Sequence, residues 1–164
     1  APLFPLADGS RGAKSAARLA RWTFDLSGAT DAIQEEAIDD LDGEFPRFDE
    51  RLAGGAYRHG WFAGDTTRSG SVKLNAIAHI DLKTGKRSVY ELNGGDLTSE
   101  PVFTPAGDNA SEGEGWLTAV IWRAAENRSD FAVFDAQNVE AGPIGLAEVP
   151  RRVPFGFHGN WVAD

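Results

Sequence analysis

The chain contains no cysteine, and this absence removes several kinds of chemistry at once. With none among its 164 residues, it can hold no disulfide framework, no thiolate metal site and no cysteine nucleophile. A reducing, cytoplasmic location is the resulting expectation. Methionine is absent as well. Because a natural chain begins with methionine, we expect the numbering to start inside a longer protein or at a processed end.

Long apolar runs and an excess of positive charge are also missing. No run approaches the roughly 18 apolar residues that a membrane-spanning helix needs, and residues 1–5 lack the basic-then-apolar order of a signal peptide. The net charge is −9, from 16 basic and 25 acidic side chains. Since nucleic acids and anionic membranes would repel such a chain, we expect neither a nucleic-acid partner nor a spanning membrane segment.

Aromatic side chains, in contrast, are plentiful. The chain has 10 phenylalanines and 5 tryptophans, and 41% of its residues are hydrophobic, which is enough for a folded core. Residues 1–17 mix proline, glycine, serine and alanine with scattered charge. We therefore expect a loop or linker over 1–17 and one folded segment over 18–164.

Short segments rich in aromatic and β-branched residues alternate with turn signals along the folded segment. None has the length and 3.6-residue period of an amphipathic helix, although a helix is the alternative for the second of them. The predicted strands are 18–26, 33–38, 56–61, 72–81, 87–92, 101–104, 116–123, 130–135 and 144–149. This pattern predicts an all-β fold: a sandwich, a barrel or propeller blades.

Two glutamates beside apolar segments are candidates for buried carboxylates. Glu44 lies between glycine and the sequence Phe-Pro-Arg, and a buried carboxylate needs a hydrogen-bond donor. An imidazole could supply it, but a plain ion pair with Arg47 is the simpler interpretation. Glu100 stands directly before Pro101, which favours an extended backbone at Glu100. Glu112 belongs to an acidic turn that we expect to be solvated.

The three histidines do not form a compact ligand pair of the H-E-x-x-H type. His158 stands out because it lies between Phe157 and Trp161 among flexible glycines. Enclosure there would favour a neutral imidazole, which can bind a metal through one nitrogen and donate through the other. A packed core histidine is the plain alternative. His59 and His79 lie in no ligand motif, and no nucleophile elbow or phosphate-binding loop occurs.

Five short motifs occur in the order, and with the spacing, of a known family. They are Glu44-Phe45-Pro46-Arg47, Ser99-Glu100-Pro101-Val102-Phe103, Glu112-Gly113-Glu114-Gly115-Trp116, Phe134-Asp135-Ala136 and Pro154-Phe155-Gly156-Phe157-His158-Gly159. Together they resemble the C-terminal part of the carotenoid cleavage oxygenases, most of all the bacterial lignostilbene dioxygenases. The resemblance runs from about Arg21 to Trp161. One departure is the Glu-Gly-Glu sequence where relatives often carry two adjacent acids before Gly-Trp.

The resemblance implies a seven-bladed β-propeller with a non-haem Fe(II) on its axis, held by four histidines. Such enzymes use O₂ to split a conjugated carbon–carbon double bond into two carbonyl products. His158 matches the last of the four ligands. Glu44 and Glu100 match glutamates that accept hydrogen bonds from ligand imidazoles, and the counterpart of Glu100 serves the ligand that matches His158. The implied substrate is a small hydrophobic conjugated molecule, a stilbenoid or an apocarotenoid, with a 4-hydroxystilbene as first choice.

The resemblance also implies that this chain forms only the C-terminal blades of the propeller. A blade takes about 40–45 residues and closure needs at least about four blades, so 164 residues make an arc. The implied partner is the N-terminal remainder of the same protein, which would supply three further ligands, and we expect iron binding and turnover only with it. The alternative from a different class is a non-catalytic β-rich binding or interaction domain.

Overall fold

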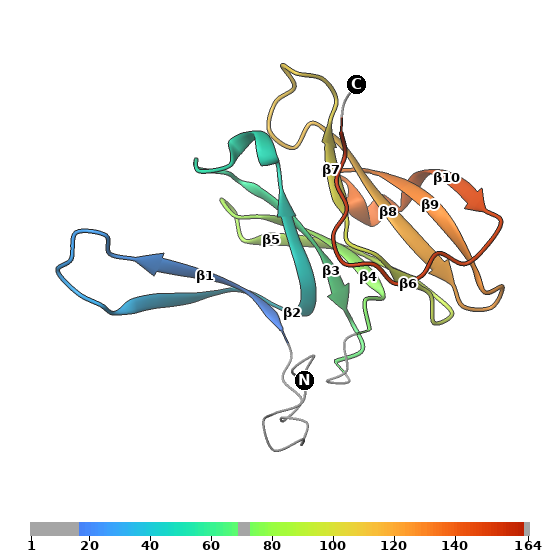
Figure 1. The fold of residues 1–164 in the computed structure, drawn as a ribbon, viewed down its shortest axis with the longest axis horizontal. Helices are drawn as coiled ribbons and strands as arrows, with labels where there is room; N and C mark the ends of the chain where they lie inside the picture. The colour runs from blue at the N-terminus through green and yellow to red at the C-terminus, as the bar shows by residue number, and fades with distance from the viewer. Residues whose placement is uncertain (1–16, 69–72, 163–164) are drawn as a thin grey trace.

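Ten strands form two antiparallel sheets in the computed structural model, which describes residues 17–68 and 73–162 (Figure 1). The first sheet has the order β1-β2-β3-β4-β5, and its strands are Arg18–Phe24, Ile33–Phe48, His59–Asp65, Ala76–Asp81 and Lys86–Glu91. The second has the order β10-β9-β8-β6, with β7 also paired to β8. Its strands, from β6 to β10, are Leu97–Thr98, Val102–Pro105, Gly115–Arg123, Arg128–Asp135 and Pro143–Val149.

The all-β prediction is confirmed. Within the described ranges the only helices are two short 3-10 turns, Glu50–Leu52 and Val139–Ala141, so no helix there is long and apolar enough to cross a membrane. Each predicted strand has a counterpart. The helix alternative for 33–38 is wrong, and the two-residue β6 was missed because it is too short to show alternation. Residue 72 of the predicted strand 72–81, and residues 1–16 of the predicted loop, lie outside the described residues.

Strand β2 is much longer than predicted because it serves two partners in turn. Its first half pairs with β1 and its second half pairs with β3. The first half and β1 form a hairpin that extends from one edge of the first sheet, away from the second sheet (Figure 1). Strand β3 also differs from the prediction of 56–61, since it begins at His59 and continues to Asp65.

Strand β3 is buried along its whole length, and its Trp61 packs against residues of the second sheet. Because side chains alternate along a strand, Trp61 faces the second sheet while Phe62 packs on the other side with Leu41 and Ala78. The Trp61 ring stacks on Phe103 of β7, with centroids 4.7 Å apart, and its Nε1 donates to the Ala136 carbonyl at 2.7 Å. The same core cluster contains Ile77, Leu92, Leu117, Ala119, Ile121, Ala132, Phe134 and Val139.

A bulge interrupts β2 just before its end. The β2–β3 register shifts between Glu44 and Arg47, and Phe45 has a φ of 58°, a left-handed conformation that is uncommon outside glycine. A bulge bends a strand and redirects its side chains. Here the Phe45 ring makes edge contacts with Phe157 and His158 near the chain's C-terminus.

The chain that follows β10 crosses back over the second sheet as an irregular segment, residues 151–161, which we call the C-terminal strap. In Figure 1 it runs past β6 and then along β7. Two contacts attach its first part. The Val153 amide donates to Ser129 Oγ at 3.0 Å, and the Arg152 guanidinium lies 5.6 Å from the centre of the Trp122 ring. The strap ends next to the turn that carries Glu100.

Replacing Trp61 by alanine should cost about 3–5 kcal/mol of unfolding free energy, because it removes a ring from the contact between the sheets. Trp22→Ala is the matched control: Trp22 is 61% exposed and Trp61 is 1% exposed, so the control should change stability by less than about 0.5 kcal/mol. Urea unfolding of each variant measures both values. Equal losses would contradict the assignment of Trp61 to the junction of the sheets.

Candidate functional site

The strap brings His158 against Glu100, which lies 58 residues earlier in the chain. His158 Nδ1 is 3.1 Å from Glu100 Oε1, and the Gly159 amide donates to Glu100 Oε2 at 2.9 Å. The Glu100 side chain is only 3% exposed. Because a buried carboxylate is costly unless donors surround it, these contacts tie the strap to the start of β7.

Arg47 is the cationic partner of Glu100. Its Nη1 lies 3.2 Å from Glu100 Oε1 and donates to the Gly159 carbonyl at 3.0 Å. Its Nη2 donates to Glu50 Oε1 at 2.5 Å and to Asn160 Oδ1 at 3.3 Å. The expected ion pair between Glu44 and Arg47 is therefore wrong, since the bulge in β2 directs Arg47 to the strap.

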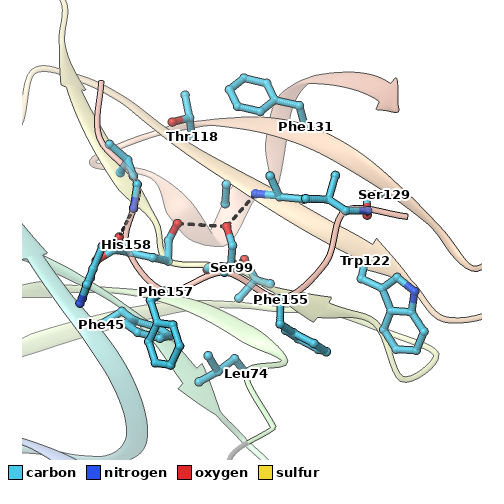
Figure 2. A pocket seen from close by; sticks show the side chains of 18 of the residues that line it. Phe45, Leu74, Ser99, Thr118, Trp122, Ser129, Phe131, Phe155, Phe157 and His158 are labelled. Atoms are coloured by element: carbon cyan, nitrogen blue, oxygen red, sulfur yellow. Dashed lines mark hydrogen bonds and ion pairs between the residues drawn. The ribbon is translucent and has the colours of Figure 1, made fainter. Parts of the chain in front are cut away.

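The His158 ring is open to solvent, with 72% of its side chain exposed. The expectation that Phe157 and Trp161 enclose it is wrong, and so is the alternative of a packed core histidine. The strap lies on the surface, where Phe157 and Trp161 are 67% and 53% exposed themselves. Figure 2 shows the ring at the edge of the strap with Phe45 nearby. Its Nε2 has no hydrogen-bond partner among the described residues.

Glu44 lies in the bulged part of β2, opposite Ala63 of β3. It is half-buried, and within the described ranges its carboxylate makes no hydrogen bond or ion pair. The structure does not bring Glu44 into contact with Glu100 or His158. The role suggested for Glu44 by the family resemblance therefore stays a prediction.

The contact between His158 and Glu100 suits His158 to act as one ligand of a metal ion. An imidazole whose Nδ1 hydrogen-bonds a carboxylate presents Nε2 in the form that metals bind, and the carboxylate orients the ring. Residues 17–68 and 73–162 contain no group of three or more histidine, cysteine, aspartate or glutamate side chains placed to hold an ion. His158 could thus serve as one ligand of a metal site, and the described residues do not supply the other ligands.

A cavity of about 410 Å³ lies beneath the strap, with Glu100 and His158 among its lining residues (Figure 2). Its walls come from the strap on one side and from the face of the second sheet on the other. They are mainly apolar and aromatic, as is usual for small-molecule pockets. The apolar lining residues include Phe45, Leu74, Leu97, Val102, Val120, Trp122, Phe131, Phe155 and Phe157.

The other two histidines form a buried pair that sequence reasoning missed. His59 Nδ1 lies 2.9 Å from His79 Nε2, and both rings stack beside Trp61. Burial, together with the neighbouring His59, lowers the pKa of His79 to about 4. The signal available in the sequence was the placement of each histidine in a predicted strand, His59 two residues before Trp61 and His79 between Ala78 and Ile80. The pairing itself depends on the register that sets His79 opposite Trp61.

The acidic turn before β8 also has a structural role. Glu112 accepts hydrogen bonds from the backbone amides of Arg58 and His59, at the beginning of β3. A carboxylate that accepts backbone N–H groups satisfies donors that would otherwise be unpaired. The expectation that Glu112 belongs to a merely solvated turn is therefore wrong.

Residues 4–163 match the protein family described as retinal pigment epithelial membrane protein. The chain is 37% identical to lignostilbene-alpha,beta-dioxygenase isozyme III of Sphingomonas paucimobilis, over 98% of this chain and 35% of that protein. It is 36% identical to a carotenoid cleavage oxygenase of Mycobacterium tuberculosis, over 92% of this chain and 30% of that protein. The chain belongs to the carotenoid cleavage oxygenase family. This confirms the resemblance drawn from the five motifs.

Solved structures of family members superpose well. A lignostilbene dioxygenase of Pseudomonas brassicacearum matches with a TM-score of 0.89 and 32% identity, over 98% of this chain and 36% of the other. A variant of the Synechocystis apocarotenoid oxygenase matches with a TM-score of 0.82 and 27% identity, over 90% and 30% respectively. The chain thus spans about a third of the length of the relatives it matches.

The buried histidine pair should make the fold sensitive to acid. His79 has an ordinary pKa of 6.5, lowered to about 4 by folding, so the unfolded chain binds a proton more readily. The contribution of neutral His79 to the free energy of unfolding is therefore fully present above pH 6.5, and it is lost progressively as the pH falls toward 4. We expect this contribution to fall by an amount on the order of 1–2 kcal/mol over this pH range.

Urea unfolding midpoints measured between these two pH values test this. His79→Gln should flatten the dependence, whereas Lys83→Gln, the same substituent in the exposed turn before β5, should retain the wild-type slope. An identical slope in the His79 variant would show that other groups cause the acid sensitivity.

Proposed function

We propose that the chain is the C-terminal arc of a seven-bladed β-propeller oxygenase, and that with an N-terminal remainder it cleaves a conjugated C=C bond of a stilbenoid using O₂. The supporting observation is the contact between His158 Nδ1 and the buried Glu100, at 3.1 Å, which leaves Nε2 open. The alternative, a non-catalytic binding domain, does not account for an exposed imidazole oriented by a buried carboxylate.

In this proposal Glu100 holds the proton on Nδ1 of His158, so that the lone pair of Nε2 is free for Fe(II). Glu44 serves the imidazole of a second histidine, in the remainder of the protein. In support, Glu44 is half-buried without a donor from the described residues, and a carboxylate in that position needs one. Both glutamates orient ligands. Neither transfers a proton.

Ferrous iron, when bound, supplies electrons and open coordination positions for O₂. A cobalt-substituted structure of the Synechocystis apocarotenoid oxygenase is among the structural relatives, which supports a divalent metal site. The overall reaction balances without another reductant: the C=C bond breaks, and each carbon receives one oxygen atom of O₂ to become a carbonyl. This chain's contribution is to supply one iron ligand, His158, and to form one side of an apolar cavity.

The preference for a stilbenoid rests on the relatives and on the cavity. Lignostilbene-alpha,beta-dioxygenase and isoeugenol monooxygenase, the latter from Pseudomonas nitroreducens and 32% identical over 91% of this chain and 33% of that protein, are both named for aromatic alkenes. The cavity beneath the strap is lined by Trp122, Phe131 and Phe155, whose faces suit planar aromatic rings. A 4-hydroxystilbene is the substrate we propose first.

Replacing His158 by alanine in the complete oxygenase should abolish both bound iron and stilbene cleavage, because one of the iron ligands is lost. Iron is measured by elemental analysis of the purified protein, and cleavage by the aldehydes formed from a 4-hydroxystilbene. Lys83→Ala, in an exposed turn far along the chain from the strap, controls for expression and handling. Full activity in the His158 variant would contradict the proposed role of His158 as an iron ligand.

Replacing Glu100 by glutamine, which has the same shape but no charge, should weaken iron retention by about 10–100-fold. Iron remaining after challenge with graded chelator concentrations gives the measurement. Glu140→Gln is the matched control, since Glu140 is exposed and lies away from the strap. Unchanged iron affinity in the Glu100 variant would assign Glu100 to the structure alone.

A further inference from the structure

The Arg47 guanidinium contacts both groups that hold His158 in place, the Glu100 carboxylate and the backbone at Gly159. Nη1 lies 3.2 Å from Glu100 Oε1, the atom that also faces His158 Nδ1. The same Nη1 donates to the carbonyl of Gly159, the residue after His158, at 3.0 Å. Arg47 therefore holds the carboxylate that orients the ring and the backbone that carries it.

From this geometry we infer that Arg47 is a positioning residue: through Glu100 and the Gly159 carbonyl it fixes the orientation and the tautomer of the His158 imidazole. The inference deepens the proposed function and rests on it where iron is concerned. The state of the ring itself, however, belongs to this chain and is measurable without iron.

The planar fork of arginine is well suited to this task. Nη1 serves Glu100 and Gly159, while Nη2 reaches the Asn160 side chain at 3.3 Å and Glu50 at 2.5 Å. Two parallel groups that bond four acceptors define an orientation, whereas the ammonium group of lysine acts as a point charge. The Arg47 side chain is 13% exposed and Glu100 is 3% exposed, so water competes weakly for the contact between these two side chains.

The bulge in β2 is what delivers Arg47 to the strap. The register shift lies between Glu44 and Arg47, and the left-handed Phe45 within it places its ring edge-on to His158, with centroids 5.6 Å apart. Phe45 and Arg47 thus meet the strap at successive residues, His158 and Gly159. One irregularity of the backbone supplies both an apolar contact for the ring and a cationic contact for its support.

Without Arg47, the donors that remain at Glu100 within the described part of the chain are the His158 ring and the Gly159 amide. The carboxylate would then be free to rotate, and the Gly159 carbonyl would lose its donor. Both changes would allow the ring to turn and the proton to move between Nδ1 and Nε2. A proton on Nε2 would block the nitrogen that faces outward.

The test is nitrogen-15 NMR of the His158 ring in the full 164-residue chain without metal, together with the exchange rate of the Gly159 amide. In the wild type we expect one tautomer, with the proton on Nδ1. Arg47→Met, which keeps an apolar stem, should give a mixture of tautomers and faster Gly159 exchange by about tenfold, as expected for the loss of one charged hydrogen bond. Arg47→Lys should give an intermediate result.

Arg51→Met is the matched control. Arg51 lies four residues later, in the 3-10 turn Glu50–Leu52, and pairs with Asp49 at 2.6 Å. Its other bonds go to the carbonyls of Gly107 and Asp108, and none of its bonds within the described residues goes to the strap. It should leave the His158 tautomer unchanged. An equal change in the Arg51 variant, or a wild-type tautomer and exchange rate in Arg47→Met, would overturn the inference. If Arg47→Met does not fold, a wild-type tautomer in Arg47→Gln overturns it equally.

A zinc titration of the complete oxygenase separates this inference from the proposed function. Arg47→Met should weaken Zn²⁺ binding by about 10–100-fold if His158 is a ligand. If the ring responds to Arg47 but the complete protein binds no metal, the positioning role stands and the iron site fails. If metal binding needs His158 but not Arg47, and the ring is unchanged, the iron site stands and the positioning role fails.

Discussion

The burial of the Glu100 carboxylate is the constraint on which the candidate site depends. A negative charge at 3% exposure is stable only if donors surround it, and each of its donors comes from elsewhere in the fold. Arg47 arrives from β2, while His158 and Gly159 arrive on the strap. The need to satisfy one carboxylate therefore holds together three segments that are distant in sequence.

The core between the sheets sets the positions of those segments. Arg47 pairs with Trp61 across β2 and β3, and Trp61 stacks on Phe103 with an interplanar angle of 5°. Phe103 lies three residues after Glu100, on the strand that Glu100 introduces. A rigid aromatic contact thus spaces the arginine from the glutamate. Close-packed interiors transmit small displacements, so a change at Trp61 would shift the positions of Arg47 and Glu100 in their ion pair.

The three histidines show how burial separates roles within one residue type. His59 and His79 lie inside, bonded to each other at 2.9 Å, where burial and the neighbouring His59 ring lower the pKa of His79. Both rings pack beside Trp61 at the junction of the sheets, and among the described residues neither lines the cavity beneath the strap. His158 lies outside, with one nitrogen on a carboxylate and the other open. Only that second arrangement prepares an imidazole for a metal.

The sequence by itself determined the pattern of strands and the family, and it pointed to Glu100 and His158 as candidate site residues. It could do so because alternation and short ordered motifs are local properties of a chain. Only the tertiary structure decided that Arg47 pairs with Glu100 and not with Glu44, that His158 is exposed, and that His59 meets His79. Each of these depends on a bulge, a strand register or the path of the strap. A side chain's partner is set by where the backbone aims it in space, and one extra residue in a strand is enough to change that direction.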